Sequence, residues 1–219
     1  MQRRQSDDSS ETVELLRRAE EGDREGLDRL LSRNRERLRR MVMLRMAQGL
    51  KGRIDASDVI QEAFMEASRR LPEYLRDRSM PFFLWLRLLT SQNLIALHRF
   101  HLGTKARDPR REVSLVHGSM PEATTEALAA QLLGQLSSPS QAAVKAEMRL
   151  KLQDGLNALE AREREILALR HFEQLSNAEA ARELGIKESA ASKRYIRALV
   201  KLRGVLASMN MTMSTPGDR

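Results

Sequence analysis

The chain has 219 residues, of which 41% are hydrophobic and 31% are charged, and its formal net charge is +8. A chain of this length can bury one large core or two small ones. It contains no cysteine, which excludes disulfide bonds, thiolate metal sites and cysteine nucleophiles. The basic balance suits a polyanionic partner such as a nucleic acid, although solubility alone would also explain it.

The residue types predict an all-α fold. Leu, Ala, Arg and Glu, all strong helix formers, dominate the chain, and alternating runs of Val, Ile and Thr are nearly absent. No apolar run near the N-terminus resembles a signal peptide. The longest apolar stretch, PFFLWLRLLT, is far shorter than a membrane span and contains Arg87. We therefore expect a cytoplasmic protein with no membrane insertion.

The N-terminal half predicts one helical domain over residues 11–103. Residues 1–10 are polar and are expected to be disordered, and the helices expected after them span 11–20, 24–48, 58–71 and 81–103. Asp55 or Ser57 can cap the third of these helices, with Asp58 in its first turn, and Pro72 helps to end it. Phe83 and Trp85 are expected in the core because their neighbours are apolar.

Residues 104–143 predict a linker, because they hold three prolines and several Gly and Ser clusters, with only a short helix around 126–133. Helical periodicity then returns over residues 144–206, which predicts a second domain. Residues 207–219 are expected to form a disordered tail.

The second domain contains the pattern of a helix-turn-helix in LSNAEAARELGIKESAASKRYIRALVKL. Ser176 or Asn177 can cap the first helix, with Glu179 in its first turn. Gly185 permits a sharp turn directly before the second helix.

The second helix of this motif has two distinct faces. Ala191, Tyr195, Ala198 and Leu202 recur at helical spacing and form a packing stripe. The side chains left for a DNA groove are Ser189, Ser192, Lys193, Ile196 and Arg197, with Arg194 at the flank. Arg can read guanine edges, Lys can reach phosphates and Ile can touch a thymine methyl group, so this face suits the major groove. The alternative is an ordinary solvated basic helix.

These motifs resemble the bacterial RNA polymerase sigma factors. The C-terminal segment LNALEAREREILALRHFEQLSNAEAARELGIKESAASKRYIRALVKLRGVL is similar to their region 4, and DASDVIQEAFMEASRRL with FFLWLRLLTSQNLIALHRF is similar to their region 2. Both motifs occur in family order with only a linker between them, as in the extracytoplasmic-function (ECF) type. The resemblance covers most of residues 11–206.

The resemblance implies a role for each part of the chain. It implies two helical domains, like sigma regions 2 and 4, that direct core RNA polymerase to promoters by binding its β′ coiled coil, its β flap and promoter DNA. Asp58, Gln61 and Glu62 correspond to the segment that docks on the β′ coiled coil. The residues Gln92, Asn93, His98 and Arg99 correspond to the part that opens and reads the −10 element. The exposed face that includes Lys193, Arg194 and Arg197 corresponds to the −35 reader, and an anti-sigma factor is a possible further partner.

One departure concerns the −35 reader. Relatives commonly carry a cation where this chain has Ser192, and here Lys193 follows it, so the charge is displaced by one residue, about 100° around the helix. The promoter preference of relatives therefore does not transfer to this chain.

Three other functions fit the sequence less well. An anti-sigma or scaffold protein is disfavoured by the net charge of +8, because a surface that binds a sigma factor should mimic DNA or polymerase. A stand-alone helix-turn-helix regulator would explain the C-terminal half but not the blocks around Gln61 and Gln92. An enzyme would need a catalytic or metal site; His98 and His101 are three residues apart, but the chain has only four His and no motif for a cofactor. The sequence thus predicts no enzymatic activity, no metal and no cofactor.

Overall fold

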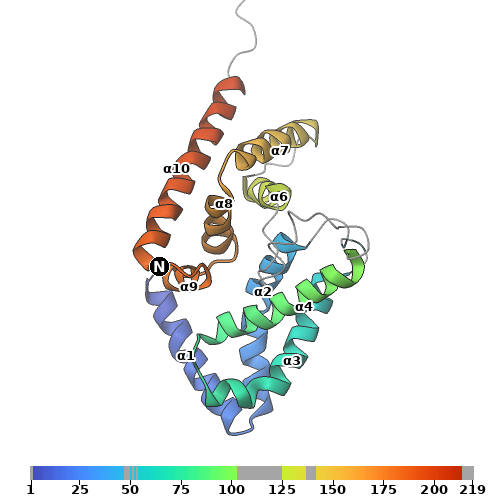
Figure 1. Cartoon of the computed structure of the whole chain (residues 1–219), viewed down its shortest axis with the longest axis vertical. Helices are drawn as coiled ribbons and strands as arrows, with labels where there is room; N and C mark the ends of the chain where they lie inside the picture. The colour runs from blue at the N-terminus through green and yellow to red at the C-terminus, as the bar shows by residue number, and fades with distance from the viewer. Residues whose placement is uncertain are drawn as a thin grey trace, which may run out of the picture. The chain divides into compact units, whose positions relative to one another are not determined.

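The computed structural model describes residues 2–46, 50, 52, 54–102, 125–136 and 142–213. Every element that these residues form is a helix, which confirms the all-α fold (Figure 1). The chain divides into two compact units, one of Met1–Val42 with Gln48–Met120 and the other of Met43–Ala47 with Pro121–Arg219. None of the helices within the described ranges has both the length and the apolar character needed to cross a membrane.

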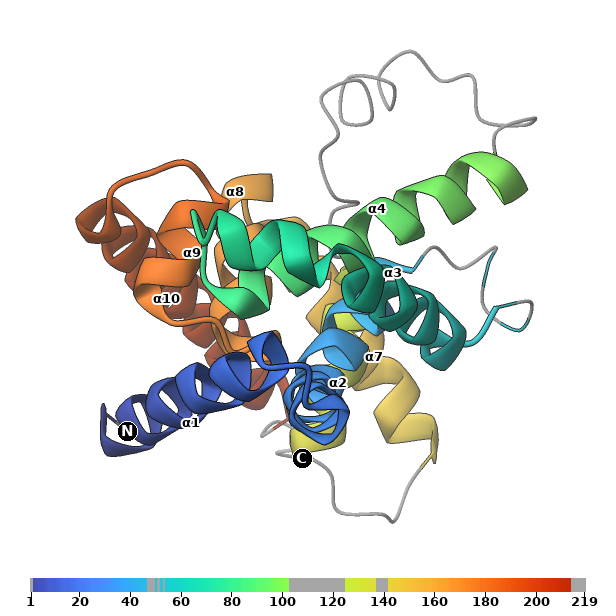
Figure 2. The same cartoon turned by 90° about the horizontal axis from the view of Figure 1, so that it is seen from below.

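The first unit contains α1 (Gln2–Glu20), most of α2 (Arg24–Arg45), α3 (Ala56–Arg76) and α4 (Phe82–Leu102). Helices α3 and α4 pack against each other, and both views of the ribbon show them side by side (Figures 1 and 2). Two arginines of α2 lie over aromatic rings of these helices, Arg35 at 5.4 Å from the ring of Phe64 and Arg37 at 3.5 Å from the ring of Phe83. These cation–π contacts join α2 to α3 and to α4.

The aromatic residues at the α3–α4 corner form part of this core. The rings of Tyr74 and Trp85 are stacked with centroids 4.7 Å apart, and Phe82 lies 5.6 Å from Trp85. The Tyr74 hydroxyl donates a hydrogen bond to the carbonyl of Met80 across 3.0 Å. Phe83 and Trp85 are 6% and 7% exposed, which confirms their predicted place in the core.

Helix α3 continues past the proline that was expected to help end it. Pro72 lies inside the helix, which runs on to Arg76, and Tyr74 in this last turn is buried. Packing of Tyr74 against Trp85 outweighs the loss of one backbone hydrogen bond at Pro72. At the other end, Asp55 accepts a hydrogen bond from Ser57 N at 2.7 Å and caps the helix as predicted.

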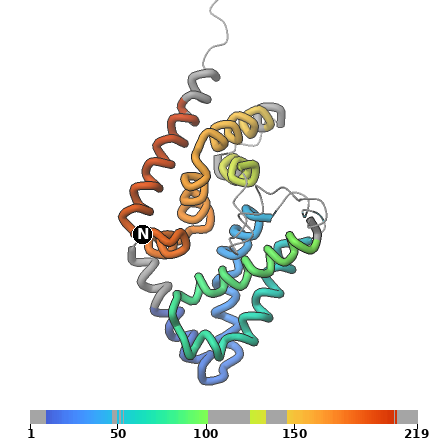
Figure 3. Tube along the Cα trace, viewed as in Figure 1, coloured from blue at the N-terminus to red at the C-terminus, as the bar shows by residue number. Residues whose placement is uncertain are grey.

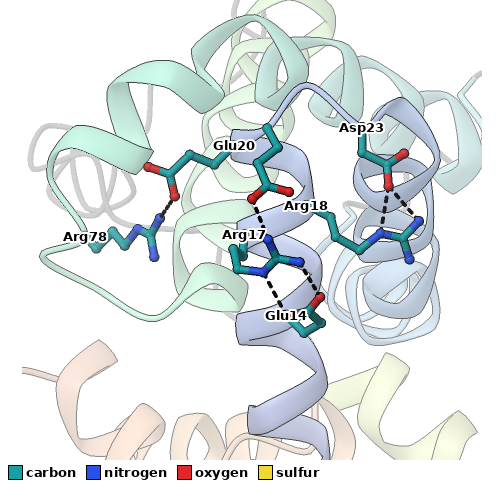
Figure 4. Close-up of polar contacts among 7 residues, drawn as sticks. Glu14, Arg17, Arg18, Glu20, Asp23 and Arg78 are labelled. Atoms are coloured by element: carbon teal, nitrogen blue, oxygen red, sulfur yellow. Dashed lines mark hydrogen bonds and ion pairs between the residues drawn. The ribbon is translucent and has the colours of Figure 1, made fainter.

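Helix α1 begins at Gln2, so the expectation that residues 1–10 are disordered is wrong for Gln2–Ser10. Several ion pairs involve side chains of its second half (Figure 4). Arg17 bonds to Glu14 and Glu21, and Arg18 bonds to Asp23 at 2.6 Å. Figure 4 also shows Glu20 of α1 paired with Arg78 of the α3–α4 loop, at 2.7 Å. Most of these pairs are exposed, and exposed ion pairs each contribute little free energy.

Among the described residues of the second unit are the helical segments α6 (Thr125–Leu136), α7 (Ala142–Asn157), α8 (Ala161–Leu167), η2 (Ala168–Phe172), α9 (Asn177–Glu183) and α10 (Glu188–Met213). The short helix expected around residues 126–133 is α6, and it packs on α7. Helix α10 packs on α7, α8 and α9 (Figure 3). It ends at Met213, so residues 207–213 are helical and not part of a disordered tail.

A buried ion cluster lies in this second unit. Arg45 is 1% exposed and donates hydrogen bonds to Glu173 at 2.6 Å and to Glu165 at 2.6 Å. Burial disfavours the charged form of Arg45, but the two carboxylates outweigh it and raise its pKa. Because Glu173 is fully buried, its carboxylate needs this partner.

Candidate nucleic-acid and polymerase interface

Helices α9 and α10 form the predicted helix-turn-helix. Ser176 caps α9 by accepting a hydrogen bond from Glu179 N at 3.1 Å, and the Glu179 carboxylate accepts from Ser176 N at 2.7 Å. Gly185 has a φ of +61°, a conformation that glycine adopts without strain. Asn177 in α9 donates to the Glu188 carbonyl at 2.9 Å. Together these bonds fix the start of α10 relative to α9.

One face of α10 is buried in the second unit. Ala191 and Ala198 are fully buried and Leu202 is 7% exposed. Tyr195 is half-buried, and the guanidinium of Arg170 lies 5.2 Å from its ring centroid. The predicted packing stripe is therefore confirmed, and the residues between its members point outward.

The outward face of α10 carries the residues that the sequence predicted for a DNA groove. Ser189, Ser192, Lys193, Ile196 and Arg197 are exposed and Arg194 is half-buried. Within the part of the chain that the structure describes, no hydrogen bond or ion pair engages Lys193 or Arg197. Val200, which the sequence reasoning missed, is 66% exposed and follows Ile196 one turn later.

The cation Lys201 differs from its neighbours on α10. Its Nζ lies 2.7 Å from a carboxylate oxygen of Glu163, which is 6% exposed. Burial raises the pKa of Glu163, but the hydrogen bonds from Lys201 and from Glu160 N outweigh it and hold the pKa below its usual range. Lys201 thus serves the fold of the second unit.

The four residues proposed for the −10 element lie on different sides of α4. Gln92 and Arg99 are exposed, and seven residues of helix place them within about 20° of each other. Asn93 and His98 are half-buried on the two flanks. The Nδ2 atom of Asn93 is buried and has no hydrogen-bond partner among the described residues. Burial lowers the pKa of His98, which favours its neutral imidazole.

The three residues proposed to dock on polymerase share the outward face of α3. Asp58, Gln61 and Glu62 are all exposed. Asp58 also has a local task, because its carboxylate accepts a hydrogen bond from Asp55 N at 3.4 Å in the capping box. Glu62 lies 3.6 Å from the guanidinium of Arg69.

Comparison with known proteins identifies the family. Residues 149–202, from α7 to α10, match the family Sigma-70, region 4. The chain is 30% identical over 203 residues to the RNA polymerase sigma factor NccH of Alcaligenes xylosoxydans xylosoxydans, covering 92% of this chain and 97% of that protein. It is also 30% identical over 182 residues to the ECF RNA polymerase sigma factor SigD of Mycobacterium tuberculosis (strain ATCC 25618 / H37Rv), covering 83% and 77%. The chain belongs to the ECF RNA polymerase sigma factors.

A solved structure, CnrH in complex with the cytosolic domain of CnrY, is 21% identical to this ECF sigma factor with a TM-score of 0.48, covering 89% of this chain and 96% of that chain. Sigma factors direct RNA polymerase to promoters, and this is the function of the chain. A stand-alone regulator is not favoured, because the relatives match over 203 and 182 residues rather than over the helix-turn-helix alone.

Proposed function

We propose that three helices divide the work of promoter-directed initiation. Helix α3 docks the sigma factor on core RNA polymerase, α4 binds the −10 element, and α10 reads the −35 element in the major groove. The observation that carries this proposal is the two-sided α10, which lies in the matched region 4 with one face buried and its cation-bearing face exposed.

The outward face of α10 has the chemistry of a groove reader. Arg197 can donate two hydrogen bonds to a guanine edge, and Ile196, 57% exposed, can contact a thymine methyl group. Ser189 and Ser192 are short enough to let the helix approach the bases closely. Because no ion pair in the described part of the chain engages Lys193, its full charge is free to replace a phosphate counterion.

On α4, Gln92 and Arg99 are the best-placed pair for the −10 element. Both side chains are exposed on one stripe of the helix. The Gln92 amide can therefore hydrogen-bond to a base while the Arg99 guanidinium contacts the adjacent DNA backbone. Burial lowers the pKa of His98, which favours the neutral imidazole, and its proposed contact is a hydrogen bond to the DNA. Asn93, half-buried, is the less accessible of the two amides.

Docking and promoter reading can be tested separately. In binding assays with purified core polymerase and with promoter duplex, replacing Gln61 and Glu62 with Ala should weaken binding to the polymerase and leave duplex binding by the free chain unchanged. Arg197→Ala should weaken duplex binding and leave binding to the polymerase unchanged. The proposal is wrong if the wild-type chain fails to support promoter-specific initiation, or if both variants behave like wild type.

We also propose that the chain does no covalent chemistry itself and acts in the cytoplasm, where polymerase and DNA are. Both statements are supported by membership of the sigma factors. The β flap as the second docking surface and an anti-sigma factor as regulator stay predictions. Copurification of the tagged chain with its partners, followed by identification of each subunit, tests both.

A further inference from the structure

Three cations follow one another along α10 at intervals of four residues. Lys193, Arg197 and Lys201 are all exposed, and each lies about one helical turn from the next. Their ionic partners differ along this row. Among the described residues, no hydrogen bond or ion pair engages Lys193 or Arg197, whereas Nζ of Lys201 lies 2.7 Å from Oε2 of Glu163 in α8. The last cation of the row is therefore the one that is compensated within the protein.

The carboxylate of Glu163 is held in place by more than Lys201. The side chain of Glu163 is only 8% exposed, and its Oε2 also accepts a hydrogen bond from Glu160 N at 3.1 Å in the capping box of α8. The side chain of Lys201 is 48% exposed and consists of a flexible four-carbon stem. Glu163 is thus a fixed acceptor, and Lys201 is the member of the pair that can turn toward another anion.

Lys201 lies on α10 where a helix seated in the major groove meets the DNA backbone. The side chains proposed for base reading begin at Ser189, and Lys201 follows about 18 Å further along the helix axis. The major groove is about 12 Å wide, so turns of the helix this far from Ser189 leave the groove and pass near phosphates. A phosphate contact at that point carries no sequence information, because every sequence presents the same backbone.

We propose that Glu163 sets the affinity of the second unit for DNA of any sequence by holding Lys201 on the protein. The buried carboxylate occupies the place beside the ammonium group that a phosphate would otherwise take, so α10 makes one phosphate contact fewer. This inference rests on the proposed role of α10 as the −35 reader, and Glu163 acts in it as a positioning residue that contacts no DNA itself. Weaker sequence-independent binding leaves more of the chain free for polymerase, because genomic DNA offers competing sites in great excess.

The experiment measures binding of the full chain to a fluorescently labelled duplex of scrambled sequence over a range of salt concentrations. Glu163→Gln removes the negative charge and keeps an oxygen that can accept the bond from Glu160 N. It should steepen the slope of log K against log salt by about 0.9, the value for one phosphate contact, and raise the affinity about fivefold at physiological salt. Glu163→Met, apolar at the same buried position, releases Lys201 by a different chemistry and should give the same gain.

Two further variants identify the cation and control for net charge. Lys201→Met in the Glu163→Gln background should return both the affinity and the salt slope to wild-type values, because the released ammonium group is then gone. The matched control is Glu147→Gln on α7, where Glu147 pairs with Lys151 at the same distance of 2.7 Å. This substitution changes the net charge of the chain equally and should bind the scrambled duplex like wild type.

The outcomes separate this inference from the proposed function. If Lys193→Ala and Arg197→Ala leave binding to a promoter duplex unchanged, the proposed role of α10 itself fails. If they weaken that binding while Glu163→Gln matches Glu147→Gln in affinity and salt slope, the role of α10 stands and the inference is overturned. A gain that persists after Lys201 is replaced would also overturn it, because the released charge would then belong to another residue.

Discussion

Gly155 in α7 and Val205 in α10 lie so close that a β-carbon on Gly155 would come within 2.1 Å of Cγ1 of Val205. The two helices pack against each other in the second unit, and glycine lets their backbones approach at this point. The glycine is thus required by packing, since its own backbone is helical.

Gly155→Ala should destabilise the second unit. Overpacking costs about 1–3 kcal/mol, and the better helix propensity of Ala returns about 1 kcal/mol of it. The double variant with Val205→Ala should recover most of the loss, because two of the three nearest atoms are removed. Chemical denaturation of the single and double variants in a mutant cycle measures the coupling. Additive effects would show that the two side chains do not compete for the same space.

Gln174→Gly should stabilise the turn before α9. Gln174 has a φ of +59°, a left-handed conformation that costs about 1–2 kcal/mol in a residue with a β-carbon. Glycine adopts it readily but loses more entropy on folding, so we expect a net gain of about 0.5–1 kcal/mol in the free energy of unfolding. Gln174→Ala, which keeps the β-carbon, is the control and should show no gain. Equal stability of the Gly and Ala variants in urea would contradict the prediction.

Acid should destabilise the second unit through Glu163. The pKa of Glu163 is lower in the folded chain than the unfolded value of about 4.3, so its ionised form stabilises the fold above pH 4.3. That stabilisation is lost as the pH falls through the folded pKa. Glu163→Gln should therefore flatten the acid limb of a stability–pH curve measured by urea unfolding.

Lys201→Met tests the same pair from the other side. It leaves a buried carboxylate without its main partner, which should cost about 1–3 kcal/mol at pH 7 and raise the pKa of Glu163. Carbon-13 NMR of the Glu163 carboxyl reports this pKa directly. An unchanged pKa in Lys201→Met would show that the ion pair does not form in solution.

Two cations on α10 should affect DNA binding differently. Arg197→Ala should weaken binding to a promoter duplex by about 1–3 kcal/mol and relax specificity at one base pair. Lys193→Ala should weaken binding to all sequences and reduce the salt slope by about one. Titration of labelled duplexes with the holoenzyme at several salt concentrations measures both. Loss of sequence specificity in Lys193→Ala and not in Arg197→Ala would reverse the two roles.

The helices of the chain and their caps could be predicted largely from local sequence. Asp55 and Ser176 cap the helices they were expected to cap, because a side-chain oxygen in that position serves the first free backbone N–H groups. Gly185 has the positive φ that its turn needs. The two faces of α10 followed from its apolar spacing, since a stripe at intervals of three and four residues determines which side is buried.

The ends of helices were less predictable, because they depend on distant contacts. From the local sequence, Pro72 is expected to end α3. The helix nevertheless continues, and Tyr74 in its last turn is buried in the core beside Trp85. Helix α10 was expected to end near residue 206, yet the helix, which packs on α7 near Gly155, runs to Met213. Tertiary packing supplies most of the stability of a helix, so propensity alone misplaces such ends.

Within the candidate site, the sequence predicted which residues are exposed better than it predicted their partners. Lys201 and Arg197 look alike in sequence, but Lys201 donates a hydrogen bond to Glu163, 38 positions earlier, whereas Arg197 acts on Glu163 through its charge. On α4, helical geometry sets Gln92 and Asn93 about 100° apart, so adjacent amides have different exposure. Pairings over such distances follow from the fold and have no local signal.

Helix α10 is one unbroken element of 26 residues, about 39 Å long, and the side chains that we propose for the DNA groove occupy only its first three turns. An α-helix of this length is stiff, so its two ends cannot move independently. A molecule that bound the last turns near Met213 and tilted the helix by about 5° around the contact of Gly155 with Val205 would displace Ser189 by about 2 Å, because about 24 Å of helix separates Ser189 from Val205. A molecule bound at the C-terminal end of α10 would therefore change how the first turns of this helix contact DNA.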